Sequence, residues 1–205
     1  MSDNSWFEVV INGLMQMSGW EVFAASLGIA YILLAGRESQ WCWPMAFVST
    51  CIYTVLFWQH QLPMQALLNI YYIGMAVYGF VLWRRHETNV AELYIHRWPW
   101  HYHVAYLLTG STLTVLAGFY LSAYDTQYPF LDAGVMVFSV MNTVLMARKV
   151  IENWLYWQVI NSAAIVLYAL TGFYATVVMY SIYLFLAMVG FIKWRQLLNT
   201  QSKPN

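Results

Sequence analysis

The sequence contains few charged residues. Only 9% of its 205 residues are Asp, Glu, Lys or Arg, whereas a soluble domain carries about 25%. Hydrophobic residues make up 61% of the chain. So little charge cannot cover a water-exposed surface of this size, and we therefore interpret the chain as an integral membrane protein.

Cysteine is also scarce. Cys42 and Cys51 lie nine positions apart, which places them on nearly opposite faces of one helix, so they cannot pair and no disulfide framework is expected. Residues 1–19 lack the basic segment and the small-residue cleavage site of a signal peptide. Their amphipathic pattern predicts a helix that lies in the membrane interface.

Seven apolar segments follow, each of spanning or near-spanning length. They cover residues 20–35, 41–58, 62–83, 104–122, 131–147, 154–170 and 175–194. These segments predict an all-α integral membrane protein with seven transmembrane helices. The polar residues 199–205, NTQSKPN, are expected to be disordered.

The basic residues support this number of spans. With seven spans, all nine fall on one side of the membrane: Arg37, Arg84, Arg85, Arg97, Arg148, Lys149, Lys193, Arg195 and Lys203. Positive charge collects on the cytoplasmic side of membrane proteins. We therefore expect the N-terminus outside and the C-terminus in the cytoplasm.

An internal repeat appears when the chain is shifted by 111 residues. Arg37 then meets Arg148, and Trp43, Tyr72, Gly79 and Trp83 meet Trp154, Tyr183, Gly190 and Trp194. We expect a 3+1+3 arrangement of two parallel three-helix repeats, the architecture of SWEET transporters. The expected regions are an interfacial helix at 1–19, the first repeat at 20–85, a linker with the fourth transmembrane helix at 86–130, the second repeat at 131–195 and a cytoplasmic tail at 196–205. A substrate path is expected between the two repeats.

One stripe of the sixth span carries two indoles and two amides. Trp154, Trp157, Gln158 and Asn161 recur at helical spacing and share one face. A buried amide costs free energy unless it finds a partner, so this face is expected to meet other helices or a polar cavity, and its four residues are candidates for substrate binding. The alternative is that the Trp residues anchor at the interface and the amides join helices.

Further neutral residues at membrane depth are candidates for the same site. They are Trp43, Tyr53, Asn69, Tyr72, Asn142 and Tyr183. Ionisable groups are missing at this depth, which argues against proton or sodium coupling. Aromatic faces attract cations, and amides and phenols bind polar groups, so a flat organic cation with hydroxyls fits this lining and a phosphorylated anion does not.

The histidines of the segment HRWPWHYH raise the possibility of a metal site. His96, His101 and His103 lie among Trp and Pro at the cytoplasmic interface, where we expect interfacial packing instead. We expect no metal, no cofactor, no nucleic-acid partner and no enzymatic activity.

The residues 145–170, LMARKVIENWLYWQVINSAAIVLYAL, resemble the signature region of the PnuC family of vitamin transporters. The W-x-x-W-x-x-x-N spacing at Trp154, Trp157 and Asn161 is its most specific part, and residues 38–58 and 67–83 also match. The resemblance implies a multi-pass transporter of the bacterial inner membrane, often a homotrimer. It also implies facilitated diffusion of nicotinamide riboside, trapped by a cytoplasmic kinase.

Two departures leave the substrate open. Many riboside carriers of the family have Gln where this chain has Asn69, and the run WCWP at residues 41–44 is not typical of them. Related branches carry thiamine or riboflavin, which remain alternatives. A seven-helix sensor without transport is the alternative from another class, and the repeat argues against it.

Overall fold

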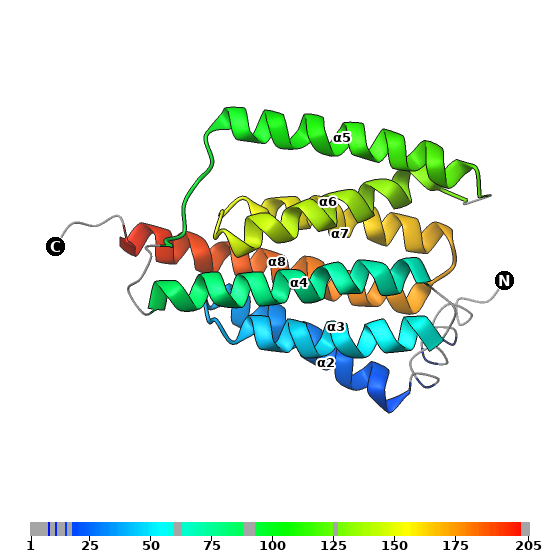
Figure 1. The fold of residues 1–205 in the computed structure, drawn as a ribbon, viewed down its shortest axis with the longest axis horizontal. Coiled ribbons are helices and arrows are strands. Elements are labelled where there is room, and N and C mark those ends of the chain that lie inside the picture. The colour runs from blue at the N-terminus through cyan, green and yellow to red at the C-terminus, as the bar shows by residue number, and fades with distance from the viewer. Residues whose placement is uncertain are drawn as a thin grey trace.

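The computed structural model describes residues 18–59, 63–87, 93–124 and 127–201, together with Glu8, Ile11 and Met15. Most of the interfacial helix predicted at residues 1–19 therefore lies outside the described residues, as do residues 202–205 of the predicted tail. The described part forms seven α-helices, which confirms an all-helical fold (Figure 1). Their bounds are α2 Gly19–Gly36, α3 Cys42–Gln59, α4 Pro63–Glu87, α5 Trp100–Ser122, α6 Pro129–Ala147, α7 Asn153–Leu170 and α8 Tyr174–Gln201.

Five of these helices are long and apolar enough to cross a membrane: α2, α4, α5, α6 and α8. The other two, α3 and α7, are each 18 residues long but less apolar. In α7 the cause is the polar stripe that contains Gln158 and Asn161. Polar residues in the two less apolar helices are expected to face protein rather than lipid.

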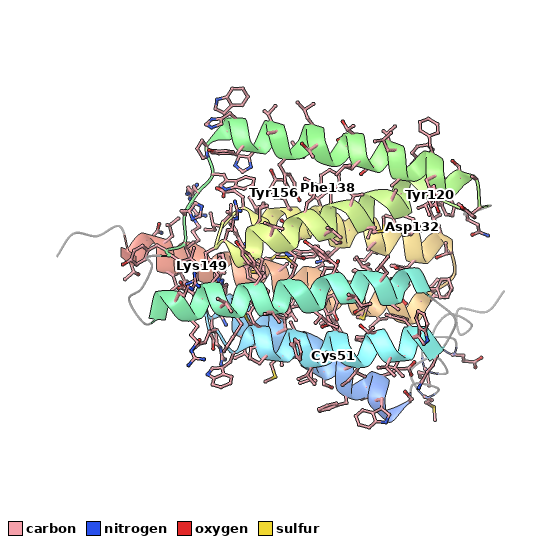
Figure 2. All side chains as sticks on the ribbon, in the orientation of Figure 1. Cys51, Tyr120, Asp132, Phe138, Lys149 and Tyr156 are labelled. Atoms are coloured by element: carbon pink, nitrogen blue, oxygen red, sulfur yellow. The ribbon has the colours of Figure 1, made fainter. Side chains whose placement is uncertain are left out.

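Two groups of three helices make up the body of the molecule. Helix α3 packs on α2 and α4, whereas α7 packs on α6 and α8. Contacts of α2 with α8 and of α4 with α6 join the two groups. Helix α5 stands at the edge of the bundle and packs mainly against α6, with further side-chain contacts to Tyr156 of α7 (Figure 1). Tyr106 of α5 contacts the rings of Phe138 and Tyr156, and the latter two are labelled beneath α5 in Figure 2.

One end of the bundle carries the connections that are rich in basic residues. The α2–α3, α4–α5 and α6–α7 connections and the end of α8 all lie at this end in Figure 1. Arg37, Arg97 and Arg148 belong to these connections. We call it the basic end of the bundle.

Helices α2 and α6 end in the same way. After α2, Ser39 N donates to Leu34 O and Glu38 N donates to Ala35 O; after α6, Val150 N donates to Leu145 O and Lys149 N donates to Met146 O. Glu38 and Lys149 have φ of 59° and 57°. This is the Schellman helix end, in which the left-handed residue is usually glycine.

Two helices extend further than the hydropathy pattern predicts. Helix α4 continues to Glu87, and α8 continues to Gln201. Residues 199–201, expected to belong to a disordered tail, are therefore helical. Helical hydrogen bonds form in water as well as in lipid, so the end of an apolar run does not fix the end of a helix.

Candidate binding site

A cavity of about 250 Å³ lies between the two three-helix groups. Helices α2, α3 and α4 form one wall, and α6, α7 and α8 form the other. The lining residues are Gly28, Tyr31, Ile32, Trp43, Ala46, Ser49, Thr50, Tyr72, Ser139, Thr143, Met146, Trp154, Trp157, Asn161, Tyr180, Tyr183 and Ala187. None of these described residues is charged, and aromatic rings dominate the set.

The structure brings six of the predicted site residues together around this cavity. They are Trp43, Tyr72, Trp154, Trp157, Asn161 and Tyr183. Tyr72 comes from α4 and Tyr183 from α8, so both groups contribute a phenol. The hydroxyl of Tyr183 lies beside Gly28 of α2, where a Cβ would approach it to 3.3 Å.

Two indoles of the lining rest on glycines. A Cβ at Gly190 would overlap the ring of Trp154, and a Cβ at Gly79 would overlap the ring of Trp43. Both tryptophans are only 1% exposed. Glycine at these two positions lets each indole lie directly against a helix backbone, which fixes the rings that wall the cavity.

The amide of Asn161 lacks a protein partner within the part of the chain that the structure describes. The residue is 3% exposed and lines the cavity. Its amide atoms are not among the fully buried, unpartnered side-chain atoms of the described residues, so they are accessible from the cavity. Asn161 is therefore placed to be satisfied by a ligand.

Each of the other predicted amides donates a hydrogen bond to a backbone carbonyl, and none of them is among the lining residues. Gln158 Nε2 donates to Leu184 O at 3.1 Å, and Asn69 Nδ2 donates to Gln65 O of its own helix at 2.9 Å. Asn142 Nδ2 donates to Asn153 O at 2.9 Å and thereby joins α6 to α7. Tyr53, also outside the lining, stacks on Phe57 with ring centroids 5.6 Å apart.

Three hydroxyls of the lining donate to backbone carbonyls. Ser49 Oγ bonds Ala24 O at 2.8 Å, Thr50 Oγ1 bonds Ala46 O at 2.8 Å, and Thr143 Oγ1 bonds Ser139 O at 2.9 Å. Since a hydroxyl has one hydrogen, each can offer a ligand only its remaining lone pairs. These groups therefore favour a ligand that donates hydrogen bonds.

Sequence reasoning missed several lining residues. Ser49, Ser139 and Thr143 are single hydroxyls in apolar helices and form no pattern. Tyr31 and Tyr180 could have been found, because they lie 111 positions from the predicted residues Asn142 and Asn69. Applying the 111-residue shift to the predicted site residues would therefore have identified both tyrosines from the sequence.

Pairs of lining residues also differ by 111 in number. The pairs are Gly28 with Ser139, Ile32 with Thr143, Trp43 with Trp154, Ala46 with Trp157, Thr50 with Asn161 and Tyr72 with Tyr183. Where the members differ strongly, the second has the larger or more polar side chain. Recognition groups therefore concentrate on α6 and α7, while small residues on α2 and α3 leave room opposite them.

Two histidines of the segment HRWPWHYH contact aromatic side chains, and the third, His96, hydrogen-bonds the Tyr94 carbonyl through Nδ1. His103 Nδ1 hydrogen-bonds the Tyr156 hydroxyl at 2.8 Å, and the rings of His101 and Tyr102 lie 4.5 Å apart. No group of three or more His, Cys, Asp or Glu that could hold a metal occurs within the described ranges.

Comparison with known proteins gives one consistent family. The model of the nicotinamide mononucleotide transporter family matches residues 18–196. The nicotinamide riboside transporter PnuC of Escherichia coli K12 is 28% identical over 208 residues, which cover 89% of this chain and 87% of that protein. The riboflavin/roseoflavin transporter RibM of Streptomyces davaonensis is 25% identical and covers 87% of this chain and 85% of its own.

A solved structure has the same fold. The crystal structure of the vitamin B3 transporter PnuC superposes with a TM-score of 0.74 at 21% sequence identity. The match covers 96% of this chain and 88% of that one.

Proposed function

Because the chain belongs to the PnuC family, and is therefore a multi-pass membrane transporter of the vitamin class rather than an enzyme, we propose that it carries nicotinamide riboside by facilitated diffusion. The main support for this proposal is the amide of Asn161, which has no hydrogen-bond partner among the described residues and faces an uncharged, aromatic cavity. The E. coli relative is named for this substrate.

The chemistry of the lining supports this substrate. Nicotinamide riboside is a flat cation with a carboxamide and ribose hydroxyls. Indole and phenol faces attract a desolvated cation by roughly 0.5–2 kcal/mol each. The acceptor oxygens of Ser49, Thr50 and Thr143 suit the ribose hydroxyls, and the amide of Asn161 suits the carboxamide.

In the proposed binding mode, Trp154 and Trp157 hold the nicotinamide ring and Asn161 binds its carboxamide. Tyr72 and Tyr183 close the site from α4 and α8.

Three further predicted residues act indirectly, through the hydrogen bonds that they donate to backbone carbonyls: Gln158, Asn69 and Asn142. Trp43 walls the cavity opposite Trp154. Tyr53 belongs to the same helix as Trp43, α3, and supports that helix by stacking on Phe57.

We further propose that the two three-helix groups are parallel repeats joined by α5, in a 3+1+3 order. Supporting this, α3 and α7 begin 111 residues apart, as do α4 and α8. The pairs of lining residues have the same offset. The positive-inside rule then places the basic end in the cytoplasm of a bacterial inner membrane, with the N-terminus outside.

Three parts of the proposal follow from the family resemblance: a homotrimer, trapping of the product by a cytoplasmic kinase, and thiamine as an alternative substrate. The similarity to RibM keeps riboflavin as a second alternative. Riboflavin has no positive charge, so the cation-attracting walls favour the riboside or thiamine over it.

Transport is expected to be equilibrative. The described lining contains no Asp, Glu or His that could bind and release a coupling proton. Radiolabelled riboside should enter protein-loaded liposomes until the inside and outside concentrations are equal, with counterflow when the lumen is preloaded. Accumulation above the outside concentration without a kinase would contradict the uniport mechanism, and binding without counterflow would favour a sensor.

Replacing Thr143 with Val is expected to weaken riboside binding by about three- to tenfold, because the variant loses one acceptor while keeping the side-chain shape. This corresponds to the net value of one hydrogen bond, about 0.5–1.5 kcal/mol. Titration calorimetry measures the change. The matched control is Thr54→Val, since Thr54 Oγ1 makes the same type of bond, to Thr50 O at 2.7 Å, but does not line the cavity. Equal effects of both variants would remove Thr143 from the site.

A further inference from the structure

Four buried indoles lie between the cavity and the basic end. Trp43 and Trp154 line the cavity, and Trp83 and Trp194 lie behind them. Ring centroids are 5.6 Å apart for Trp43 and Trp83, 6.2 Å for Trp83 and Trp194, and 5.5 Å for Trp154 and Trp194. Each residue is at most 1% exposed, so the rings form a continuous layer across the interface of the two groups.

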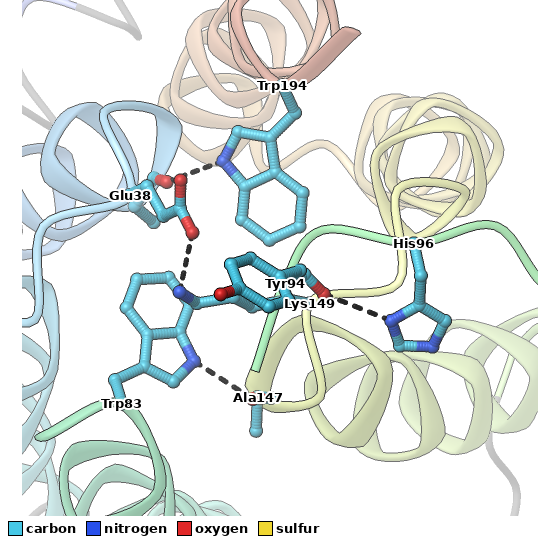
Figure 3. Close-up of polar contacts among 8 residues, drawn as sticks. Glu38, Trp83, Tyr94, His96, Ala147, Lys149 and Trp194 are labelled. Atoms are coloured by element: carbon cyan, nitrogen blue, oxygen red, sulfur yellow. Dashed lines mark hydrogen bonds and ion pairs between the residues drawn. The ribbon is translucent and has the colours of Figure 1, made fainter. Parts of the chain in front are cut away.

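Hydrogen bonds cross the interface at this layer. Trp83 Nε1 of α4 donates to Ala147 O of α6 at 2.9 Å (Figure 3). Trp194 Nε1 of α8 donates to Ala35 O of α2, also at 2.9 Å. Each three-helix group therefore donates one hydrogen bond to the other, and the two bonds hold the groups together at the basic end of the bundle.

An ion pair completes this closure. Lys149 Nζ lies 2.5 Å from Glu38 Oε1 and 4.9 Å from the centre of the Trp83 ring (Figure 3). The side chains of Lys149 and Glu38 are 3% and 17% exposed. The pair joins the turn after α2 to the turn after α6, so it spans the two groups.

The backbone of both turns indicates that the charged side chains are kept for their contact. Glu38 and Lys149 occupy the left-handed positions of the two helix ends, where glycine is the favoured residue and any Cβ adds strain. A buried ion pair is a poor source of stability. A charged pair at two glycine positions is therefore better explained by a switching role than by stabilisation of the fold.

The layer of four indoles also contains hydrogen-bond donors that are not satisfied. The indole nitrogens of Trp43 and Trp154 are buried and have no hydrogen-bond partner among the described residues. Unsatisfied buried donors raise the free energy of the state that contains them. Rearrangement of this layer can therefore recover part of the free energy that is lost when the ion pair separates.

We propose that the Glu38–Lys149 pair is the latch of a gate at the basic end, with the four indoles as its closed layer. The inference rests on the proposed transport function, because a gate is needed only if the cavity opens alternately to the two sides. Separation of Glu38 from Lys149 lets the two groups part at this end and exposes the layer to the adjoining water.

Cys42 provides a native reporter for the gate. It is 0% exposed and belongs to the same buried cluster as the four indoles. In a Cys51→Ala background, its modification by a membrane-impermeant methanethiosulfonate reagent in inside-out vesicles measures opening at the basic end. A Cys42→Ala variant gives the background signal.

The double variant Glu38→Gly, Lys149→Gly tests the latch. Glycine suits both left-handed positions, and removal of both charges leaves no buried charge unpaired, so the protein is expected to fold with a nearly unchanged melting temperature. Modification of Cys42 is expected to be at least tenfold faster. The control Arg148→Ala removes a neighbouring exposed charge and is expected to leave the rate unchanged. An unchanged rate in the double glycine variant would overturn the proposal.

The exchange variant Glu38→Lys, Lys149→Glu keeps the pair in the opposite sense. Because the two positions have nearly the same φ, it is expected to restore slow modification, whereas Lys149→Glu alone gives fast modification. Fast modification in the exchange variant would show that direct pairing is not the latch. Riboside uptake by the parent protein, measured in parallel, separates the two claims, since its failure would remove the proposed substrate but not the Cys42 result.

Discussion

Replacing Asn161 with Leu is expected to weaken nicotinamide riboside binding by about 10- to 100-fold, with the fold intact. The amide has no protein partner among the described residues and lines the cavity, so its loss removes ligand contacts only. A polar ligand group buried without its partner costs about 1–3 kcal/mol. Leu is close in size to Asn, so the cavity is expected to keep its shape.

Titration calorimetry measures this affinity, and thermal unfolding checks the fold. Ser162→Leu is the matched control, because Ser162 is the next residue of α7 and is exposed on the outside of the bundle. It makes the same kind of polar-to-apolar change away from the cavity and is expected to bind normally. If Asn161→Leu keeps the parental affinity, Asn161 is not a substrate ligand.

Replacing Gly190 with Ala is expected to reduce affinity by at least about tenfold and to lower the melting temperature. The added methyl group would overlap the ring of Trp154, so the indole must move. Overpacking of this kind costs about 1–3 kcal/mol of stability. The displaced ring also leaves the position in which it is proposed to hold the nicotinamide ring.

Two glycines of α4 serve as controls for this variant. Gly74→Ala adds a methyl group that has no atom of the described residues within 4 Å, so it is expected to leave binding unchanged. Gly79→Ala displaces Trp43 in the same manner and is expected to lower stability similarly but affinity less, because Trp154 and not Trp43 lies on the wall that carries Asn161. Equal losses of affinity in Gly79→Ala and Gly190→Ala would contradict the assignment of recognition to the second group.

The helices could be predicted from the sequence because the requirement for them is local. A segment that crosses lipid must be apolar and satisfy its own backbone hydrogen bonds, so each span is visible by itself. The less apolar α7 was still recognised, because its amides lie on one stripe and leave the rest of its surface apolar. The ends of α4 and α8 were predicted too short, since hydropathy reports the lipid boundary and not the helix boundary.

The site could be predicted only in part because side-chain partners depend on neighbouring helices. Gln158 and Asn161 share one helical face in the sequence, yet Gln158 donates to a carbonyl of α8 while Asn161 lines the cavity. A periodicity cannot distinguish these outcomes, because it gives a direction from the helix axis and no information about what lies there.

The role of Lys149 was hidden for the same reason. Its position after a span indicated a charge in solvent, as for its neighbour Arg148. The structure instead buries it against Trp83 and Glu38. The pairing of two residues 111 positions apart requires the two helix groups to be docked before it can be recognised.

The most direct test of the account is a calorimetric comparison of nicotinamide riboside with its 5′-phosphate on the purified protein. The cavity lining contains no Lys or Arg among the described residues, and a buried anion without a partner is strongly disfavoured. The account predicts binding of the riboside and at least a 100-fold weaker affinity for the phosphorylated form. Equal or tighter binding of the phosphorylated form would contradict the central claim that an uncharged, aromatic cavity selects a cationic substrate.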